Sequence, residues 1–181
     1  MRVFIAVNFH EQVKKRLALI QRELRAQFGH GNFTRLENLH LTLSFIGEVR
    51  PEAIAGITAA MKELAYEPIE FSLSGFGTFG RRGDILWMGL RESGALCDVY
   101  EQLSAALERA GYPRESRKFS PHLTLAREVA KKSAFDIGEF AERIGAIDCR
   151  ADAVSLMCSE RVNGALVYRE IYSKKSNADN R

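Results

Sequence analysis

One tetrapeptide occurs twice in the chain, and this repeat constrains the fold more than any other feature of the sequence. The two copies are His40-Leu41-Thr42-Leu43 and His122-Leu123-Thr124-Leu125. Side chains alternate across a β-strand, so in each copy the histidine and threonine share one face and the leucines share the other. The leucines anchor each strand on a hydrophobic core, and the polar faces point away from that core. We interpret the repeat as two related lobes that face one another.

The same alternation makes predictions for the residues that follow each motif. It places Ser44 on the face of His40 and Thr42, and Phe45 on the leucine face. It places Arg127 on the face opposite His122. Arg127 therefore reaches the histidine only beyond the regular strand or past a β-bulge.

The segments around the repeat alternate between helical and strand-like patterns. We expect strands at 2–8, 39–47, 71–79, 85–90, 122–127, 151–159 and 165–172, and helices at 11–28, 51–65, 95–110 and 135–144. Turns are expected at 30–32, at 80–84 and at Asn163-Gly164, a strong hairpin signal. This mixture predicts an α+β fold with antiparallel sheet. Residues 1–172 are expected to form one domain, and the polar residues 173–181 a frayed tail.

Composition excludes several classes of protein. The net charge is +3, which permits an anionic partner without requiring one. No apolar run approaches the roughly 20 residues of a membrane span, and no signal peptide opens the chain, so we expect a cytoplasmic protein without a membrane partner. The three cysteines, Cys97, Cys149 and Cys158, have no CxxC spacing and are expected to be reduced thiols.

Two strand-borne histidines suit phosphodiester chemistry. One neutral imidazole can accept a proton from an attacking water or hydroxyl, and one imidazolium can donate a proton to the leaving oxygen. Thr42 and Thr124 can each donate a hydrogen bond to a non-bridging phosphate oxygen. Two imidazoles fall short of the three protein ligands of a catalytic zinc, and no HExxH motif or GK[ST] loop is present. We therefore expect neither a metal nor a cofactor.

The sequence resembles the 2H phosphoesterase superfamily, which is defined by two His-x-Thr-x motifs. Within it, the chain is similar to the RNA 2′,3′-cyclic phosphodiesterases, historically called 2′-5′ RNA ligases. The similarity extends from the opening strand, Arg2 to Val7, through the first motif and the following Phe45-Ile46-Gly47-Glu48-Val49, to Arg127. The chain departs from the family at Leu36, where many members have a proline.

The resemblance implies a bilobal α+β fold with pseudo-twofold symmetry, in which antiparallel sheets line a central groove and helices pack outside. It implies hydrolysis of RNA 2′,3′-cyclic phosphate ends to 2′-phosphates, with His40 as proton donor and His122 as proton acceptor. The motifs are nearly symmetric, so the residues themselves do not orient these two roles. The resemblance also favours a role near the substrate for Arg127, with a plain salt bridge as the alternative.

Two other functions stay open: 2′-5′ ligation of RNA halves, and a non-catalytic module that binds RNA ends. The expected partners are RNA ends or small cyclic-phosphate nucleotides rather than DNA, and the expected state is a monomer. Ser44 and Phe119 are further candidates for substrate binding.

Other side chains have less specific interpretations. Phe33, Phe76 and Phe119 could stack on a base, with core packing as the alternative. Arg81 and Arg82 could contact RNA phosphates or simply occupy a solvated turn. Trp87 is expected in the core, and His10 and His30 are expected on the surface.

Overall fold

The protein, described here from a computed structural model, is an α+β fold. The structure describes residues 1–80, 84–131 and 135–177. Its strands are β1 (Arg2–Asn8), β2 (Phe28–Phe33), β3 (His40–Glu48), β4 (Ile69–Phe79), β5 (Ile85–Arg91), β6 (Leu123–Lys131), β7 (Ile147–Ala151), β8 (Ala153–Val162) and β9 (Ala165–Lys175). Its helices are α1 (Glu11–Gln27), η1 (Leu36–Asn38, a 3-10 turn), α2 (Ala53–Lys62), α3 (Gly94–Arg109) and α4 (Ile137–Ile144). The strand pairs in these ranges are antiparallel, which confirms the predicted class.

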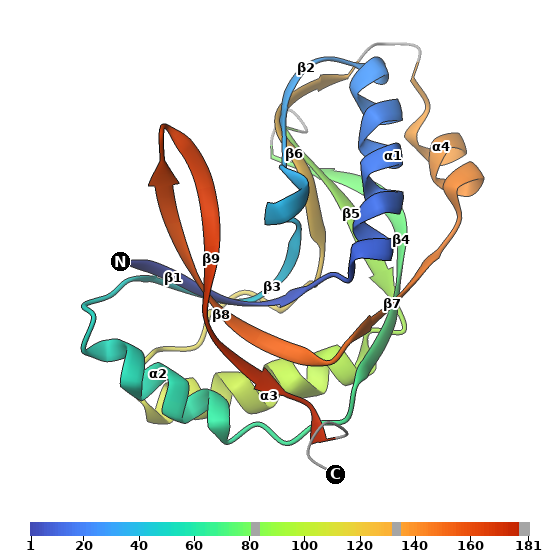
Figure 1. Ribbon diagram of the computed structural model, residues 1–181. Helices are drawn as coiled ribbons and strands as arrows, with labels where there is room; N and C mark the ends of the chain where they lie inside the picture. Colours follow the sequence, from blue (N-terminus) through green and yellow to red (C-terminus); the bar gives the residue numbers. More distant parts are fainter. Residues whose placement is uncertain (81–83, 132–134, 178–181) are drawn as a thin grey trace.

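The two motif strands lie side by side at the centre of one sheet. The strand order is β7-β4-β5-β6-β3-β1-β8-β9, with β2 paired to β6 outside this path. Strands β3 and β6 join where Leu41 lies opposite Leu123. Each motif strand is thus followed outward by three more strands of this path, as expected for two related lobes. The sheet is strongly curled, and the β8–β9 hairpin projects from it (Figure 1).

One large hydrophobic core spans both lobes, and a small second cluster consists of Phe4, Ala6 and Met157. Leu41, Leu123 and Leu125 are fully buried in the large core, together with Leu17 and Leu24 from the apolar face of α1. Helices α2 and α3 pack against each other, α1 packs against β2, and α4 packs against β4 (Figure 1). Among the described residues, none of these helices combines the length and apolar character needed to cross a bilayer.

The segment after α1 differs from the prediction. Residues 30–32 were expected to form a turn, but they belong to strand β2, which pairs with β6. Gly31 is needed here for close approach rather than for a turn, because a Cβ at this position would lie 2.7 Å from Cγ1 of Val129. The glycine that suggested a break in structure therefore permits strand pairing.

The C-terminal part of the chain is also more ordered than predicted. Strand β7 was not expected, and β9 continues to Lys175 instead of ending at residue 172. The backbone N–H of Ser176 donates to the carbonyl of Asp152, and that of Asn177 to the carbonyl of Tyr66, each at 2.8 Å. These tertiary bonds hold residues that local sequence marks as a polar tail.

The two hairpins are confirmed where the structure describes them. Strands β4 and β5 pair as expected, although Arg81 and Arg82 of their turn lie outside the described residues. In the β8–β9 turn, Asn163 and Gly164 have φ values of 50° and 81°. Positive φ at both positions is the requirement of a type I′ turn, which explains the strength of the Asn-Gly signal.

The junction of the two lobes gives a stability prediction. Leu41→Ala removes a fully buried side chain at the β3–β6 contact and should lower the free energy of unfolding by about 2–5 kcal/mol. Leu19→Ala, the matched control, truncates a leucine that is 52% exposed on α1 and should cost less than about 0.5 kcal/mol. Urea denaturation measures both. Equal losses would contradict the placement of Leu41 in the core that joins the lobes.

Candidate functional site

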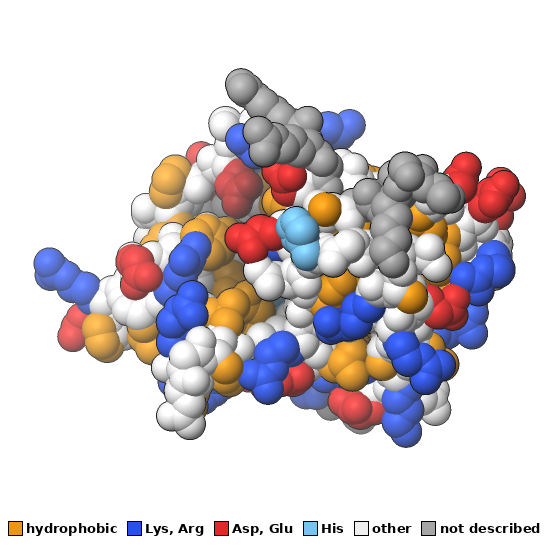
Figure 2. Space-filling view, turned by 90° about the horizontal axis from the view of Figure 1, so that it is seen from above, with side chains coloured by type: hydrophobic (Ala, Val, Ile, Leu, Met, Phe, Trp, Pro, Cys, Tyr) orange, Lys and Arg blue, Asp and Glu red, His pale blue; other side chains and the backbone are white. Residues whose placement is uncertain are grey.

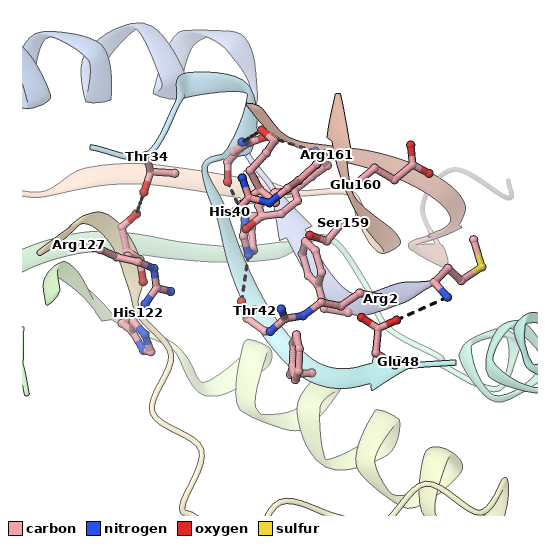
Figure 3. Close-up of a pocket in the computed structure, with 17 residues that line it drawn as sticks. Arg2, Thr34, His40, Thr42, Glu48, His122, Arg127, Ser159, Glu160 and Arg161 are labelled. Carbon is pink, nitrogen blue, oxygen red and sulfur yellow. Dashed lines mark hydrogen bonds and ion pairs between the residues drawn. The ribbon is translucent and has the colours of Figure 1, made fainter. Parts of the chain in front are cut away.

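Both histidine motifs open onto one pocket of about 700 Å³. His40 and Thr42 line it from β3, and Thr124 and Arg127 line it from β6, with His122 immediately before that strand. Figure 3 shows His122 and Arg127 on one side of the pocket and His40 and Thr42 on the other. Seen from above, this face of the molecule is hollowed, with hydrophobic side chains inside the hollow and charged side chains at its edge (Figure 2).

Each motif strand contains a β-bulge at the same place. Ala6 of β1 lies opposite Thr42, and its neighbour Ile5 lies opposite Ser44. Leu43 therefore has no partner in β1 and is an extra residue in β3. The second motif repeats this pattern: Trp87 and Leu86 of β5 lie opposite Thr124 and Ala126, so Leu125 is an extra residue in β6. The fourth residue of each tetrapeptide is therefore the bulged one.

The bulges reverse the alternation beyond each motif. Arg127 lines the pocket, as the bulge interpretation required, and so does Phe45, its counterpart after the first motif. The prediction that Ser44 shares the face of His40 is wrong for the same reason. Ser44 lines a smaller pocket beside α3, together with Tyr100.

Each histidine is held by the backbone two residues before it. Nδ1 of His40 lies 2.7 Å from the carbonyl oxygen of Asn38, and Nδ1 of His122 lies 2.9 Å from that of Ser120. A carbonyl oxygen only accepts, so Nδ1 of each ring carries the hydrogen. Nε2 is then the ring nitrogen available for proton transfer. In the neutral form of His40 it accepts from the Thr42 hydroxyl, at 3.0 Å.

Asn38 connects the first motif to the β8–β9 hairpin through hydrogen bonds, a role that no pattern in the sequence indicated. Its side chain is buried, with Nδ2 donating to the carbonyl of Leu166 at 2.9 Å and Oδ1 accepting from the N–H of Tyr168 at 3.3 Å. The same residue holds the His40 ring through its carbonyl. Asn38 therefore fixes the β8–β9 hairpin relative to the first histidine.

Gln21 supports the second motif in a comparable way. It is a buried polar residue on α1, and its Nε2 donates to the carbonyls of Thr34 and Leu125, at 2.9 and 3.1 Å. Leu125 is the bulged residue, and its carbonyl also accepts from the backbone N–H of Thr34, at 2.9 Å. A bulge disrupts the regular ladder, and these donors satisfy the carbonyl that it exposes. Gln21 thus stabilises the bulge that turns Arg127 toward the pocket.

The electrostatics of the pocket favour an anion. No carboxylate within the described ranges forms an ion pair with Arg127. Burial lowers the pKa of His40 below its ordinary value of 6.5, the hydrogen bond to Asn38 opposes this shift, and the charges of Arg127 and His122 add to it. A phosphate anion would oppose the repulsion among these cationic groups.

Aromatic side chains surround both histidines. The His40 ring lies 4.7 Å from the ring of Phe4 and 5.2 Å from that of Tyr168, and His122 lies 4.9 Å from Phe79. These contacts come from β1, β9 and β4, far from the motifs in sequence. They restrict the rotation of each imidazole in addition to the Nδ1 hydrogen bonds.

The other predicted aromatic contacts lie elsewhere. Phe119 stacks on Tyr100 at 4.0 Å, and Phe76 packs on Phe140 at 5.2 Å. Phe33 lies beneath the guanidinium of Arg25. These three phenylalanines pack against the core, and none of them lines the histidine pocket, including Phe119, our candidate for substrate binding.

The remaining predictions concern surface histidines, Trp87 and the cysteines. His10 and His30 are exposed, as expected. Trp87 is half-buried and stacks on Phe79 next to His122, so it lies closer to the site than a core assignment implies. The cysteines are free thiols. Within the described part of the chain, no three His, Cys, Asp or Glu side chains are arranged to hold a metal ion.

Comparison with known sequences identifies related proteins over most of the chain. The model of the 2′-5′ RNA ligase superfamily matches residues 10–163. An RNA 2′,3′-cyclic phosphodiesterase of Archaeoglobus fulgidus is 33% identical, over 72% of this chain and 74% of that protein. A protein of the same name from Thermotoga maritima is 34% identical, over 70% of each chain.

Solved structures share the fold. Escherichia coli LigT complexed with 3′-AMP superposes with a TM-score of 0.81 at 21% identity, covering 97% of this chain and 98% of that one. TT0787 of Thermus thermophilus superposes with a TM-score of 0.76 at 26% identity, covering 97% of each chain. The two-lobed arrangement is therefore that of known proteins.

The proximity of Arg127 to His40 gives a prediction that NMR can test. Arg127→Met should raise the pKa of His40, because the cation that disfavours the imidazolium is removed. Titration of the ¹⁵N-labelled imidazole measures this pKa. The matched control is Arg22→Met, on the exposed face of α1 outside the pocket, which should leave the pKa of His40 unchanged. An unchanged or lower pKa in Arg127→Met would contradict the predicted interaction.

Proposed function

Because the chain belongs to the 2′-5′ RNA ligase superfamily, we propose that it hydrolyses 2′,3′-cyclic phosphates at RNA ends to 2′-phosphates. The observation that carries the proposal is the pair of histidines in one pocket, each with Nδ1 held by a backbone carbonyl. Such a pair supplies one proton acceptor and one proton donor through Nε2. The names of the curated relatives agree with this reaction.

The proposed mechanism uses the two histidines on opposite sides of the phosphorus atom. Nε2 of His122 accepts a proton from water as the water oxygen bonds to phosphorus. The bond from phosphorus to the 3′ oxygen breaks, and Nε2–H of His40 donates its proton to that oxygen. The products are a 2′-phosphate and a 3′-hydroxyl. Proton exchange with solvent then returns both histidines to their starting forms.

Thr42, Thr124 and Arg127 are proposed to stabilise the charge on the non-bridging phosphate oxygens. The threonine hydroxyls can donate hydrogen bonds, and the guanidinium adds a full charge with a fork of N–H donors. These three groups line the same pocket as the histidines. No step of this mechanism requires a metal ion.

The pocket gives a reason to assign the donor role to His40. In an in-line displacement, the attacking water and the departing oxygen lie on opposite sides of phosphorus. The pocket extends mainly on the β1–β3–β8–β9 side, which holds His40. A nucleoside bound on that side brings its 3′ oxygen to His40 and leaves the water at His122.

A second candidate reaction is 2′-5′ ligation of RNA halves, which the description of the matching family favours. By microscopic reversibility the same histidine pair can serve both directions. In ligation, the 5′-hydroxyl of a second RNA strand attacks phosphorus in place of water, and the product is a 2′-5′ phosphodiester. Product analysis on an oligonucleotide that ends in a 2′,3′-cyclic phosphate separates the two reactions.

Substitution of the histidines tests the proposal. His40→Ala and His122→Ala should each reduce hydrolysis by about 10²–10⁴-fold, because each removes one partner of the acid–base pair. His10→Ala and His30→Ala, both at exposed positions outside the pocket, are the matched controls and should retain activity. Circular dichroism establishes that the variants are folded.

Full activity in either pocket variant would exclude the two-histidine mechanism. Binding of RNA with no product in the wild type would favour the non-catalytic module instead. Activity that EDTA abolishes and added metal restores would contradict a metal-independent reaction.

The lowered pKa of His40 predicts a difference between two pH profiles. A proton donor must be protonated, so activity falls as the pH rises through its pKa. In the free enzyme this pKa is below 6.5, and the alkaline limb of kcat/KM should therefore lie below pH 6.5. A bound phosphate anion raises the pKa, so the alkaline limb of kcat should lie at higher pH. Coincident limbs would contradict the donor role of His40.

A further inference from the structure

The pocket is not symmetric about the histidine pair. Beyond His40 it continues along the arm formed by β1, β3, β8 and β9, where Arg2, Phe45, Arg161 and Tyr168 line it. On the other arm, the pocket-lining residues of β6 are limited to Thr124 and Arg127 among the described residues. Within the described residues, the pocket therefore extends farther on the side of His40 than on the side of His122, where Thr34 is the other lining residue.

The arginines of the extension lack acidic partners. Neither Arg2 nor Arg161 forms an ion pair with a carboxylate in the described ranges. The guanidinium of Arg2 instead lies 4.9 Å from the centroid of the Phe45 ring, and that of Arg161 donates to the carbonyl of Gly164 at 3.1 Å. Both side chains are exposed, so their charges are available to a ligand.

The two glutamates of the extension do not cancel these charges. Glu160 pairs with Arg169 at 2.7 Å, and this contact lowers the pKa of the Glu160 carboxyl. Glu48 lies 3.6 Å from the amino group of Met1. Each carboxylate therefore has a cationic partner other than Arg2 and Arg161. The extension therefore keeps two positive charges that no carboxylate in the described ranges pairs with.

A single cyclic phosphate does not account for these charges. It carries one negative charge, and Arg127 with the histidine pair lies where that charge is proposed to bind. An oligonucleotide brings a further phosphate with every nucleotide on its 5′ side. Arginine is suited to such a partner, because its planar fork of donors matches phosphate oxygens.

We propose that the extension binds the RNA chain on the 5′ side of the cyclic phosphate, with Arg2 and Arg161 contacting internucleotide phosphates. The protein then distinguishes an RNA end from a free cyclic mononucleotide. This inference rests on the proposed function. It adds where the body of the RNA binds, over the β1–β3–β8–β9 arm, and the two arginines that contact it.

The test compares two substrates: a short oligoribonucleotide ending in a 2′,3′-cyclic phosphate and the corresponding 2′,3′-cyclic mononucleotide. Arg2→Met and Arg161→Met remove the charge but keep an apolar stem, so Met at position 2 retains contact with Phe45. Each variant should lose about tenfold in kcat/KM on the oligonucleotide, the size of one charge-assisted hydrogen bond. Hydrolysis of the mononucleotide should stay within about twofold of wild type. The matched control, Arg22→Met, should alter neither.

Salt dependence gives a second readout. For single strands, each lost phosphate contact reduces the slope of log affinity against log salt by about 0.7. Both arginine substitutions, made in the His122→Ala background so that hydrolysis is slow during the binding measurement, should therefore show a shallower slope for oligonucleotide binding.

The outcomes separate the two proposals. A wild-type protein that hydrolyses neither substrate would overturn the proposed function itself. If the wild type hydrolyses both substrates, and Arg2→Met and Arg161→Met either change neither rate or lower the two rates equally, only the inference about the extension is overturned. An equal loss in Arg22→Met would assign the effect to net charge and overturn it as well.

Discussion

The structure depends on the contact between Leu41 and Leu123, where β3 meets β6. Both leucines are fully buried in one core, so the two motif strands cannot separate without exposing it. Because side chains alternate on a strand, burying these leucines forces the neighbouring histidines and threonines to the opposite face. The hydrophobic junction therefore brings together two polar sets that are distant in sequence.

The β-bulges then decide what accompanies the histidines. Each bulge is at the last leucine of its tetrapeptide, and each turns the residue two positions later into the pocket. The residue delivered is Phe45 in one half and Arg127 in the other. The same backbone device thus produces two different chemical surfaces. The first half regains a positive charge through Arg2, which lies over Phe45.

Buried amides hold these irregular strands in place. Gln21 donates to the carbonyl of Leu125 at the second bulge, and Asn38 fixes the β8–β9 hairpin beside His40. Burying an amide side chain lowers stability unless it forms hydrogen bonds, and the side chains of both residues form them. The pocket therefore depends on two buried amide side chains outside the His-Leu-Thr-Leu motifs, and one of them, Asn38, also lines it.

By itself, the sequence determined the class of fold and the central residues of the site. The exact repetition of His-Leu-Thr-Leu predicted two strands with matching faces, and Asn163-Gly164 predicted the β8–β9 turn, because both signals depend on local geometry alone. The helical pattern of residues 11–28 likewise predicted α1. Pairing partners such as β2 and β7 were missed, since a strand of five or six residues is stabilised mainly by its neighbours.

Only the tertiary structure decided which side chains follow the histidines into the pocket. Strict alternation placed Ser44 there and Phe45 outside, and the bulge at Leu43 reversed both. The extension lined by Arg2 and Arg161 was also invisible in sequence, because β1 and β8 become neighbours only when the sheet forms. A bulge depends on partner strands and on buried donors such as Gln21. Residue spacing specifies neither. For this reason the motifs predicted the paired histidines and threonines, while the fold decided the shape and charge of the pocket around them.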